Sequence, residues 1–313
     1  MRSCMKPYMR SWVKYMRSWV KLRALAVVIA AAGAAAAGAC SSAPTASPLP
    51  AAASPLPAAS GEPAGYWTQS RRLAATPWRE PGYQPGPSAS APPPEPGVRV
   101  GALFEHDASG NHFCTASVVA SPGRDLLITA AHCISGGKSG GYRQDIVFIP
   151  GYRDGQAPHG IWAAAQLVVA PQWMNSSDPD YDVGFVVLKP DDGKNVEDVL
   201  GADRLGIDPG YRNQVRVTGY PASDDAPVTC AGWTSQQSPS QLRFECDGFT
   251  GGTSGSPWVT DVDSQTGTGT IVGVLGGYQE GGSTAAISYS PYLGEQVEQL
   301  YHQAVADEAA QAG

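Results

Sequence analysis

The sequence predicts an all-β domain that is built in two halves and closed by one helix. From Val98 onward, short runs rich in β-branched and aromatic residues alternate with turns rich in Gly, Pro, Asp and Asn. The runs form two groups of six, and the charged, Asp/Gly-rich stretch 189–210 separates the groups. The last part of the chain instead repeats apolar residues at helical spacing. Together these observations predict two six-stranded halves and a C-terminal helix.

Each predicted element follows from a local run of residues. The first half, about 98–190, has six predicted strands: Val98–Phe104, Phe113–Val119, Leu126–Thr129, Ile146–Ile149, Ala164–Val169 and Val183–Leu188. The second half, about 211–290, has six more: Val215–Gly219, Val228–Thr234, Leu242–Cys246, Ser256–Thr260, Thr270–Leu275 and Ala285–Tyr289. The helix is expected over about 291–311, with Ser290 as its N-cap and an apolar face of Leu293, Val297, Leu300, Tyr301 and Val305.

Residues 1–40 have the composition of an export signal. They contain seven basic and no acidic side chains, and the uncharged run Ala24–Ala39 is shorter than the ~20 residues of a membrane span. Cys40 follows Ala37-Gly38-Ala39, which resembles the bacterial lipobox, in which the cysteine is lipidated. The same string fits an ordinary cleavage site. A lipid anchor at Cys40 and free secretion therefore both stay open, and we expect a secreted or envelope-associated protein of bacterial type.

Residues 41–97 are too poor in large apolar side chains to build a core. Their richness in Ala, Pro, Ser and Gly predicts an extended tether or a pro-segment. Tyr66-Trp67 and Trp78 interrupt this composition, so we expect a short part of the segment to dock on the domain that follows. The domain itself is expected over residues 98–313.

The charge balance argues against nucleic-acid binding. The formal net charge is −7, and without the leader's seven basic side chains the remaining 14 basic residues face 28 acidic ones. A chain this acidic is poorly suited to contact a phosphate backbone. We therefore expect no nucleic-acid partner, no cofactor and no membrane contact beyond a lipid at Cys40. We also expect the protein to be a monomer.

The cysteines of the predicted domain form an even set: Cys114, Cys133, Cys230 and Cys246. In an exported protein such a set indicates two disulfides, for which three pairings exist. Local pairing would tie one loop in each half, and each bond would stabilise the fold by about 3 kcal/mol. A zinc site is the rival interpretation, but the chain has no Cys-x2-Cys pair and its five histidines are scattered. We expect no metal.

Three motifs carry the components of nucleophilic catalysis. Ser254 lies between glycines in Gly251–Pro257, a string that favours a tight turn with unobstructed backbone N–H groups. A serine hydroxyl needs a base, and His132 in Thr129–Cys133 is the candidate. A charged imidazole in turn needs a fixed carboxylate, which we assign to Asp182 because an apolar strand follows it directly.

Two other aspartates compete for that third role. Asp178 and Asp180 alternate with Asp182, and the alternation also raises calcium binding. The stretch lacks the glycine and the distal glutamate of a calcium-binding loop, so a solvated acidic turn is favoured over calcium. Asp182 stays the preferred assignment.

The motifs, their His-Asp-Ser order, the Cys114/Cys133 bracket around the histidine and the strand count resemble the chymotrypsin-like serine peptidases. Within that family, Thr253-Ser254-Gly255-Ser256-Pro257 and Thr218-Gly219-Tyr220-Pro221 are similar to the bacterial V8-like branch of glutamyl endopeptidases. The resemblance spans about residues 98–290. It implies two antiparallel six-stranded β-barrels, an endopeptidase that forms an acyl-enzyme, and an oxyanion hole made by the N–H groups of Gly252 and Ser254. The motif order also excludes an α/β-hydrolase.

The residues expected at the specificity pocket depart from both branches. Gly248 stands where trypsin-like enzymes hold an acidic specificity residue, and Leu275 stands where glutamate-specific enzymes carry a histidine. With Phe249, these residues predict a pocket for a modest apolar side chain. Thr253 replaces the aspartate that pairs with a newly cut amino terminus in trypsin-like zymogens, so that mode of activation is not expected. A catalytically silent binding module and an envelope-anchored structural protein remain as alternative functions.

Overall fold

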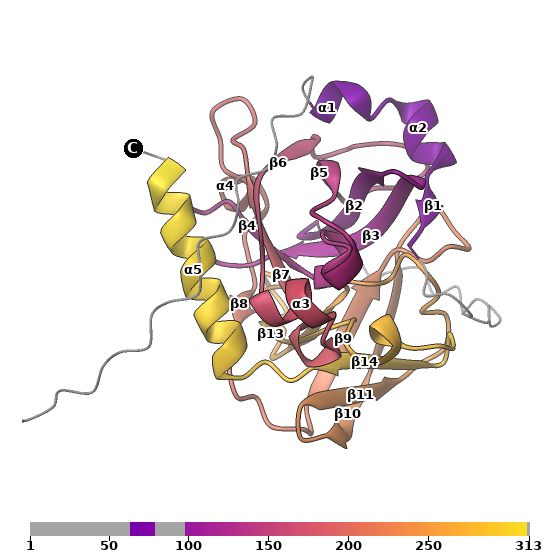
Figure 1. Ribbon diagram of the computed structural model, residues 1–313, viewed down its shortest axis with the longest axis vertical. Coiled ribbons are helices and arrows are strands. Elements are labelled where there is room, and N and C mark those ends of the chain that lie inside the picture. The colour runs from indigo at the N-terminus through magenta and orange to yellow at the C-terminus, as the bar shows by residue number, and fades with distance from the viewer. Residues whose placement is uncertain (1–62, 79–97, 312–313) are drawn as a thin grey trace, which may run out of the picture. The chain divides into compact units, whose positions relative to one another are not determined.

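The structure is a computed structural model that describes residues 63–78 and 98–311 (Figure 1). The expectations for the export signal and for Cys40 lie outside the described residues. All described residues belong to one unit, Leu49–Gly313. Within the described ranges, no helix is both long and apolar enough to cross a bilayer.

The first half is a closed antiparallel barrel of six strands. They are β2 (Val100–Asp107), β3 (Gly110–Val118), β4 (Leu126–Thr129), β5 (Gln144–Pro150), β6 (Trp162–Val169) and β7 (Gly184–Leu188). The strands pair in the order β3-β2-β5-β6-β7-β4, and the β3–β4 pairing closes the ring. All six predicted strands are confirmed. Side chains that alternate along them, such as Leu103, Phe148 and Val186, fill one buried cluster.

The second half contains the other six predicted strands and one short addition. They are β9 (Gln214–Gly219), β10 (Val228–Ser238), β11 (Gln241–Glu245), β12 (Pro257–Thr260), β13 (Thr270–Val274) and β14 (Ile287–Pro291). The order is β14-β11-β10-β9-β12-β13, and β8 (Arg204–Leu205) extends the sheet parallel to β13. Gly276 N–H donates to Tyr289 C=O at 3.0 Å, which joins the chain after β13 to β14. Trp258 is fully buried in the core of this half. The two halves fit the double-barrel fold that the resemblance implies.

The C-terminal helix is confirmed, but its predicted N-cap is wrong. Helix α5 spans Glu295–Gln311 and packs on β6 and β7, as the yellow helix of Figure 1 shows. Ser290 instead belongs to β14, where it pairs with Leu242, and its hydroxyl accepts a hydrogen bond from Val274 N–H. Strand pairing to β11 outweighs the local capping signal, so the helix begins at Glu295, four residues later than predicted.

One apolar cluster holds the two halves and the helix together. It contains Ile128 and Phe185 from the first barrel, Val274 from the second half, and Val297 and Leu300 from α5. Because both halves contribute to this cluster, the loop after β4, the loop before β7 and the turn before β12 are held in fixed positions relative to one another. Those loops carry the candidate catalytic residues.

Several short elements carry no clear sequence signal. They are α1 (Pro63–Tyr66), α2 (Gln69–Ala74), β1 (Thr76–Pro77), α3 (Pro171–Ser176) and α4 (Val196–Leu200), with 3₁₀ helices η1 (Ala131–Cys133), η2 (Gly137–Ser139), η3 (Pro179–Tyr181) and η4 (Tyr278–Gly281). The first three elements form a segment, residues 63–78, that lies on the first barrel (Figure 1). Trp67 is its main anchor: the ring is 1% exposed and its Nε1–H donates to Asp145 C=O at 2.5 Å.

The cysteines form the two local disulfides, Cys114–Cys133 and Cys230–Cys246. One bond ties η1 to β3 in the first barrel, and the other joins the regions of β10 and β11 in the second half. The side chains of Cys114, Cys133 and His132 lie within 4.8 Å of one another. Both sulfur atoms are in the disulfide, however, so neither offers a thiolate to a metal.

Candidate active site

His132 and Asp182 form a buried hydrogen-bonded pair at one end of the first barrel. His132 lies in η1, directly after β4, and only 1% of its surface is exposed. Its Nδ1–H donates to Asp182 Oδ2 at 2.8 Å, and its backbone N–H donates to Oδ1 of the same carboxylate at 2.9 Å. The disulfide that joins Cys133 to β3 fixes the short helix. The pair therefore has both a set distance and a set ring orientation.

The second half also holds the Asp182 carboxylate. Asp182 is fully buried between η3 and β7, and Gly277 N–H, in the loop after β13, donates to Oδ2 at 2.8 Å. The two neighbouring aspartates have other partners. Asp178 caps η3 by accepting from Asp180 N–H, and Asp180 accepts from Gln241 Nε2 at 2.7 Å. Of these three carboxylates, Asp182 is the one that contacts His132.

Burial and charge act in opposite directions on the pKa of His132. Burial of the ring disfavours the charged imidazolium and by itself lowers the pKa. The Asp182 charge and its hydrogen bond favour the charged form, and the charge of Glu280 adds to this effect. The net result is a pKa above the ordinary value of 6.5. The site thus stabilises an imidazolium, which is the state that a general base reaches after it takes a proton.

Ser254 lies on a tight turn between β11 and β12, and only 7% of its surface is exposed. Gly252 and Gly255 have φ values of 92° and 86°, a region that side chains disfavour. A Cβ at Gly255 would overlap Thr115 C=O and the Thr129 hydroxyl of the first barrel. The Ser254 carbonyl accepts from Thr115 N–H at 2.7 Å. The glycines therefore let the serine turn pack against the strands that lead to His132.

His132 Nε2 is buried and has no hydrogen-bond partner among the described residues. The hydroxyl of Ser254 is thus not hydrogen-bonded to it in this conformation. Such contacts are often long without substrate and tighten when substrate binds. The structure brings His132 and Asp182 into direct contact and places Ser254 on the adjoining turn, while Nε2 keeps a free lone pair or proton.

The cavity beside Ser254 differs from the predicted apolar pocket. Phe249 and Leu275 line it as expected, whereas Gly248 is not among its lining residues. Glu280 and Trp78 also line it, and sequence reasoning assigned neither of them to a pocket. The available signal for Glu280 was the glycine bracket of Gly277 and Gly281-Gly282, which indicates a turn with left-handed backbone around an acidic side chain.

Trp78, the last described residue of the segment 63–78, contacts the serine turn. Trp78 N–H donates to Phe113 C=O at 3.0 Å, and Gly252 N–H donates to Trp78 C=O at 3.2 Å. Gly252 is one of the two predicted oxyanion donors. Its N–H is therefore already hydrogen-bonded to the chain's own backbone, at Trp78 C=O. The Ser254 N–H, the other predicted donor, has no partner in the described part of the chain.

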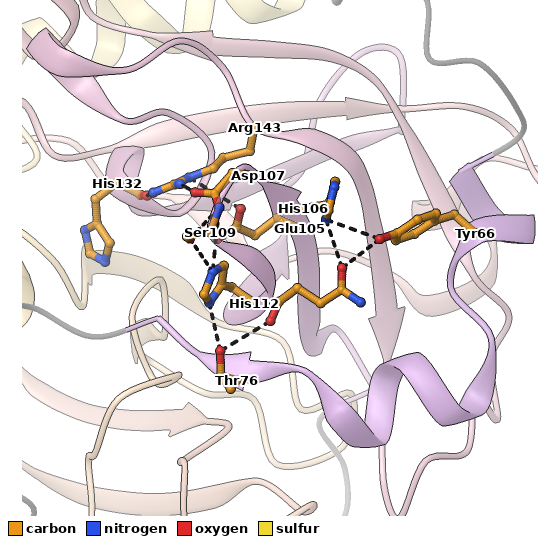
Figure 2. Close-up of polar contacts among 10 residues, drawn as sticks. Tyr66, Thr76, Glu105, His106, Asp107, Ser109, His112, His132 and Arg143 are labelled. Carbon is orange, nitrogen blue, oxygen red and sulfur yellow. Dashed lines mark hydrogen bonds and ion pairs between the residues drawn. The ribbon is translucent and has the colours of Figure 1, made fainter.

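A charged network links this segment to His132 (Figure 2). Arg143 forms an ion pair with Asp107, lies 3.4 Å from Glu105 and donates to His132 C=O at 3.4 Å. Its guanidinium stacks on the Trp78 ring, 3.9 Å from the ring centre. Burial raises the pKa of Glu105 to about 8, although Arg143 acts to lower it.

The β2–β3 hairpin holds the segment by three further contacts. Figure 2 shows Tyr66 beside His106 and Thr76 beside His112. The Tyr66 hydroxyl lies 3.2 Å from His106 Nδ1 and donates to Asn111 at 2.8 Å, and Thr76 Oγ1 lies 2.9 Å from His112 Nδ1. The β2–β3 hairpin therefore contacts the segment from Tyr66 to Trp78.

Comparison with known proteins places these features in a family. The family model for trypsin-like peptidase domains matches residues 114–274, just over half of the chain. No curated protein sequence matches. Among solved structures, the thermostable serine protease AL20 from an extremophilic microorganism superposes with a TM-score of 0.61 and 29% identity, over 67% of this chain and 98% of that one. Protease Anisep from Arthrobacter nicotinovorans superposes with a TM-score of 0.60 and 28% sequence identity, over 67% of this chain and 97% of that one. A Glu endopeptidase superposes with a TM-score of 0.56 over 71% of this chain and 98% of that one. Its sequence identity is only 17%, so this likeness shows the fold alone.

Proposed function

The chain belongs to the trypsin-like peptidase family, and from that premise we propose that it is an exported serine endopeptidase. Ser254 is the nucleophile, His132 the general base and acid, and Asp182 the group that orients the imidazole. The buried His132–Asp182 pair, in hydrogen-bond contact at 2.8 Å, carries the proposal. The proposed substrate is a polypeptide and the proposed active form is a monomer.

The roles follow from which ring nitrogen is engaged. Because Nδ1–H donates to Asp182, the neutral tautomer presents an unprotonated Nε2, which has no other partner in the described residues. Nε2 takes the Ser254 proton as Oγ attacks the carbonyl carbon, and then returns it to the leaving amine. Water repeats the two steps to release the acyl group. Throughout, the Asp182 carboxylate stabilises the transient imidazolium.

The oxyanion of the tetrahedral intermediate needs donors that are already in place. The N–H groups of Gly252 and Ser254 are the proposed pair, and losing one such donor costs about 2.7–4 kcal/mol of transition-state stabilisation. The motif Thr253–Pro257 supports placing the enzyme in the V8-like branch. Activity and branch are separate proposals, because a V8-like motif does not require cleavage after glutamate.

Export is proposed on the leader and the disulfides together. Two disulfides form and persist in oxidising compartments outside the cytosol. Detergent-phase partitioning of the exported protein, with Cys40→Ser as the control, separates the two remaining forms. A wild-type protein that enters the detergent phase while the variant stays aqueous is lipid-anchored. If both stay aqueous, the protein is freely secreted.

We further propose that the segment 63–78 belongs to an inhibitory pro-segment, preceding a peptidase domain that begins near residue 98. The backbone carbonyl of Trp78 accepts a hydrogen bond from Gly252 N–H, and the Trp78 side chain lines the cavity beside Ser254. A substrate carbonyl needs the same N–H. Binding of the segment and binding of substrate are therefore mutually exclusive at this position.

A fluorophosphonate probe tests the proposed chemistry, because it labels only an activated serine. The full exported chain is labelled as wild type, Ser254→Ala, His132→Ala and Ser264→Ala, and the intact mass records which amino terminus is present. Ser264 is an exposed serine in the turn after β12 and is the matched control. Wild type and the control are expected to label, at a rate set by the fraction of chains whose segment is undocked, and the Ser254→Ala and His132→Ala variants are not.

Latency must be separated from lack of activity. A folded wild type that does not label, together with a folded Trp78→Ala variant that also does not label, would overturn the peptidase proposal. That outcome would favour the catalytically silent binding module. Labelling of the Trp78→Ala variant alone would keep the peptidase and identify the segment as its inhibitor.

A further inference from the structure

The loop after β13 has an unusual backbone that turns one acidic side chain towards Ser254. Gln279 and Glu280 both adopt left-handed conformations, with φ of 53° and 49°, between Gly277 and Gly281, with φ of 80° and 100°. Two consecutive non-glycine residues in this region are costly for the backbone. Strain of this kind persists only where the surroundings enforce it, and it concentrates at functional sites.

Hydrogen bonds to the catalytic region enforce this shape. Gly277 N–H donates to Asp182, and Tyr278 N–H donates to Gln241 Oε1 at 3.2 Å. Within the loop, Glu280 N–H donates to Gly277 C=O at 2.9 Å. The position of Glu280 is therefore fixed relative to the catalytic carboxylate, as a specificity residue requires.

The Glu280 carboxyl group lies in the cavity that Ser254 borders. Phe249 and Leu275 form apolar parts of the same lining. Glu280 Oε2 is buried and has no hydrogen-bond partner, and none of the described lining residues carries a positive charge. A buried carboxylate oxygen without a donor loses its hydration and receives nothing in return. The cavity thus contains an acidic group without a cationic partner among the described lining residues.

We propose that Glu280 makes this enzyme selective for a cationic side chain, lysine or arginine, in the substrate residue on the acyl side of the scissile bond. The inference rests on the proposed peptidase function. The ammonium or guanidinium group completes the ion pair with Glu280, while Phe249 and Leu275 pack along its aliphatic stem. This proposal departs from the apolar preference expected from Gly248, Phe249 and Leu275, because Glu280 lines the cavity together with Phe249 and Leu275.

Charge decides between the possible substrate classes. A glutamate or aspartate side chain would meet a carboxylate of the same sign. A leucine side chain would fit the apolar walls but leave the buried Glu280 Oε2 without a partner. A cation is the class that satisfies both the walls and the carboxylate. Trp78 lines the same cavity, so release of its segment would enlarge the space for such a side chain.

The test compares fluorogenic peptides that differ only in the residue before the cleaved bond: Arg, Lys, Leu or Glu. Wild type, Glu280→Gln and Glu298→Gln are assayed as full chains. Glu298 is an exposed glutamate on α5 and supplies the matched control for loss of one charge. Because Glu280 also affects His132, the measured quantity is the ratio of kcat/KM for Arg to that for Leu, in which a change in the base cancels.

Wild type and the control are expected to prefer Arg and Lys to Leu and Glu. Glu280→Gln is expected to lower the Arg-to-Leu ratio about 10- to 100-fold, the range for losing a charged hydrogen-bond partner. A second measurement does not depend on turnover. Benzamidine, a small aryl cation, should slow fluorophosphonate labelling of wild type and not of Glu280→Gln, and neutral benzamide should slow neither.

Each outcome separates this inference from the proposed function. Labelling of Ser254 with a preference for Leu or Glu peptides, or an unchanged ratio in Glu280→Gln, would overturn the role of Glu280 and leave the peptidase intact. Absence of labelling in wild type and in Trp78→Ala would instead overturn the peptidase. Protection by benzamidine that survives in Glu280→Gln would place the cation elsewhere and would also contradict the inference.

Discussion

Replacing Trp78 by alanine should activate the full-length chain. The change removes the ring that stacks on Arg143 at 3.9 Å and meets the His112 ring edge-on at 5.5 Å. It leaves the peptide that bonds Gly252 in place. The catalytic residues are untouched, so any gain in labelling reports the segment alone.

The two ring contacts set the expected size of the effect. A cation over an aromatic face contributes about 0.5–2 kcal/mol, and an aromatic pair contributes about 0.5–1.5 kcal/mol. Together they amount to roughly 1–3.5 kcal/mol, which changes the ratio of docked to undocked segment about 5- to 300-fold. While the docked form dominates, the labelling rate is proportional to the undocked fraction. The rate should therefore rise by the same factor.

The assay is the rate of fluorophosphonate labelling of the full chain at a pH where His132 is neutral. Trp233→Ala is the matched control, because Trp233 also stacks on an arginine, Arg212 at 4.6 Å, but is 52% exposed and belongs to β10. Circular dichroism checks that each variant is folded. A folded Trp78→Ala variant that labels at the wild-type rate would refute the idea that the segment blocks the site.

Three further predictions follow from single residues. The labelling rate should fall on acidification with a midpoint above pH 6.5, because only neutral His132 accepts a proton and its pKa is raised. In Glu280→Gln a pH series should place the midpoint lower, since the Glu280 charge contributes to the raised pKa of His132. An unmoved midpoint would contradict that contribution. Gly255→Ala should lower stability in chemical denaturation by about 1–3 kcal/mol more than Gly193→Ala, since both residues have positive φ but only Gly255 is crowded; equal losses would show that crowding does not matter. Glu105 has a pKa of about 8 in the folded state and an ordinary value of 4.5, so the folded state retains a proton that the unfolded state releases. The free energy of unfolding should therefore decline as pH rises from 4.5 through 8. Chemical denaturation at about pH 5 and pH 8 measures this decline, and in Glu105→Gln the part due to Glu105 should be absent.

The strands were predictable because their signal is local. β4 has the same bounds, Leu126–Thr129, in sequence and structure, since an apolar run between turn residues has few alternatives once both of its faces are buried. The prediction of Ser290 as N-cap failed for the complementary reason. A capping signal is also local, but β11 offers that residue a complete set of strand partners, and pairing across the sheet decides where the helix begins.

The site divides in the same way. The motif context of His132, Asp182 and Ser254 is written along the chain, so the chemistry could be assigned without coordinates. The sequence favoured Asp182 among three aspartates, but only the structure shows its contact with the imidazole, because that contact joins η1 to the loop before β7. Nor could it place Glu280 and Trp78 at one cavity, since more than 200 residues separate them along the chain.

By itself, the sequence determined the fold class, the twelve main strands and the kind of chemistry, because these depend on residue type and short-range periodicity. Only the tertiary structure decided what fills the cavity beside Ser254 and which N–H groups are already engaged. Both depend on loops from different parts of the chain meeting at the junction of the two halves. The long-range packing that brings those loops together has no local signature in the sequence.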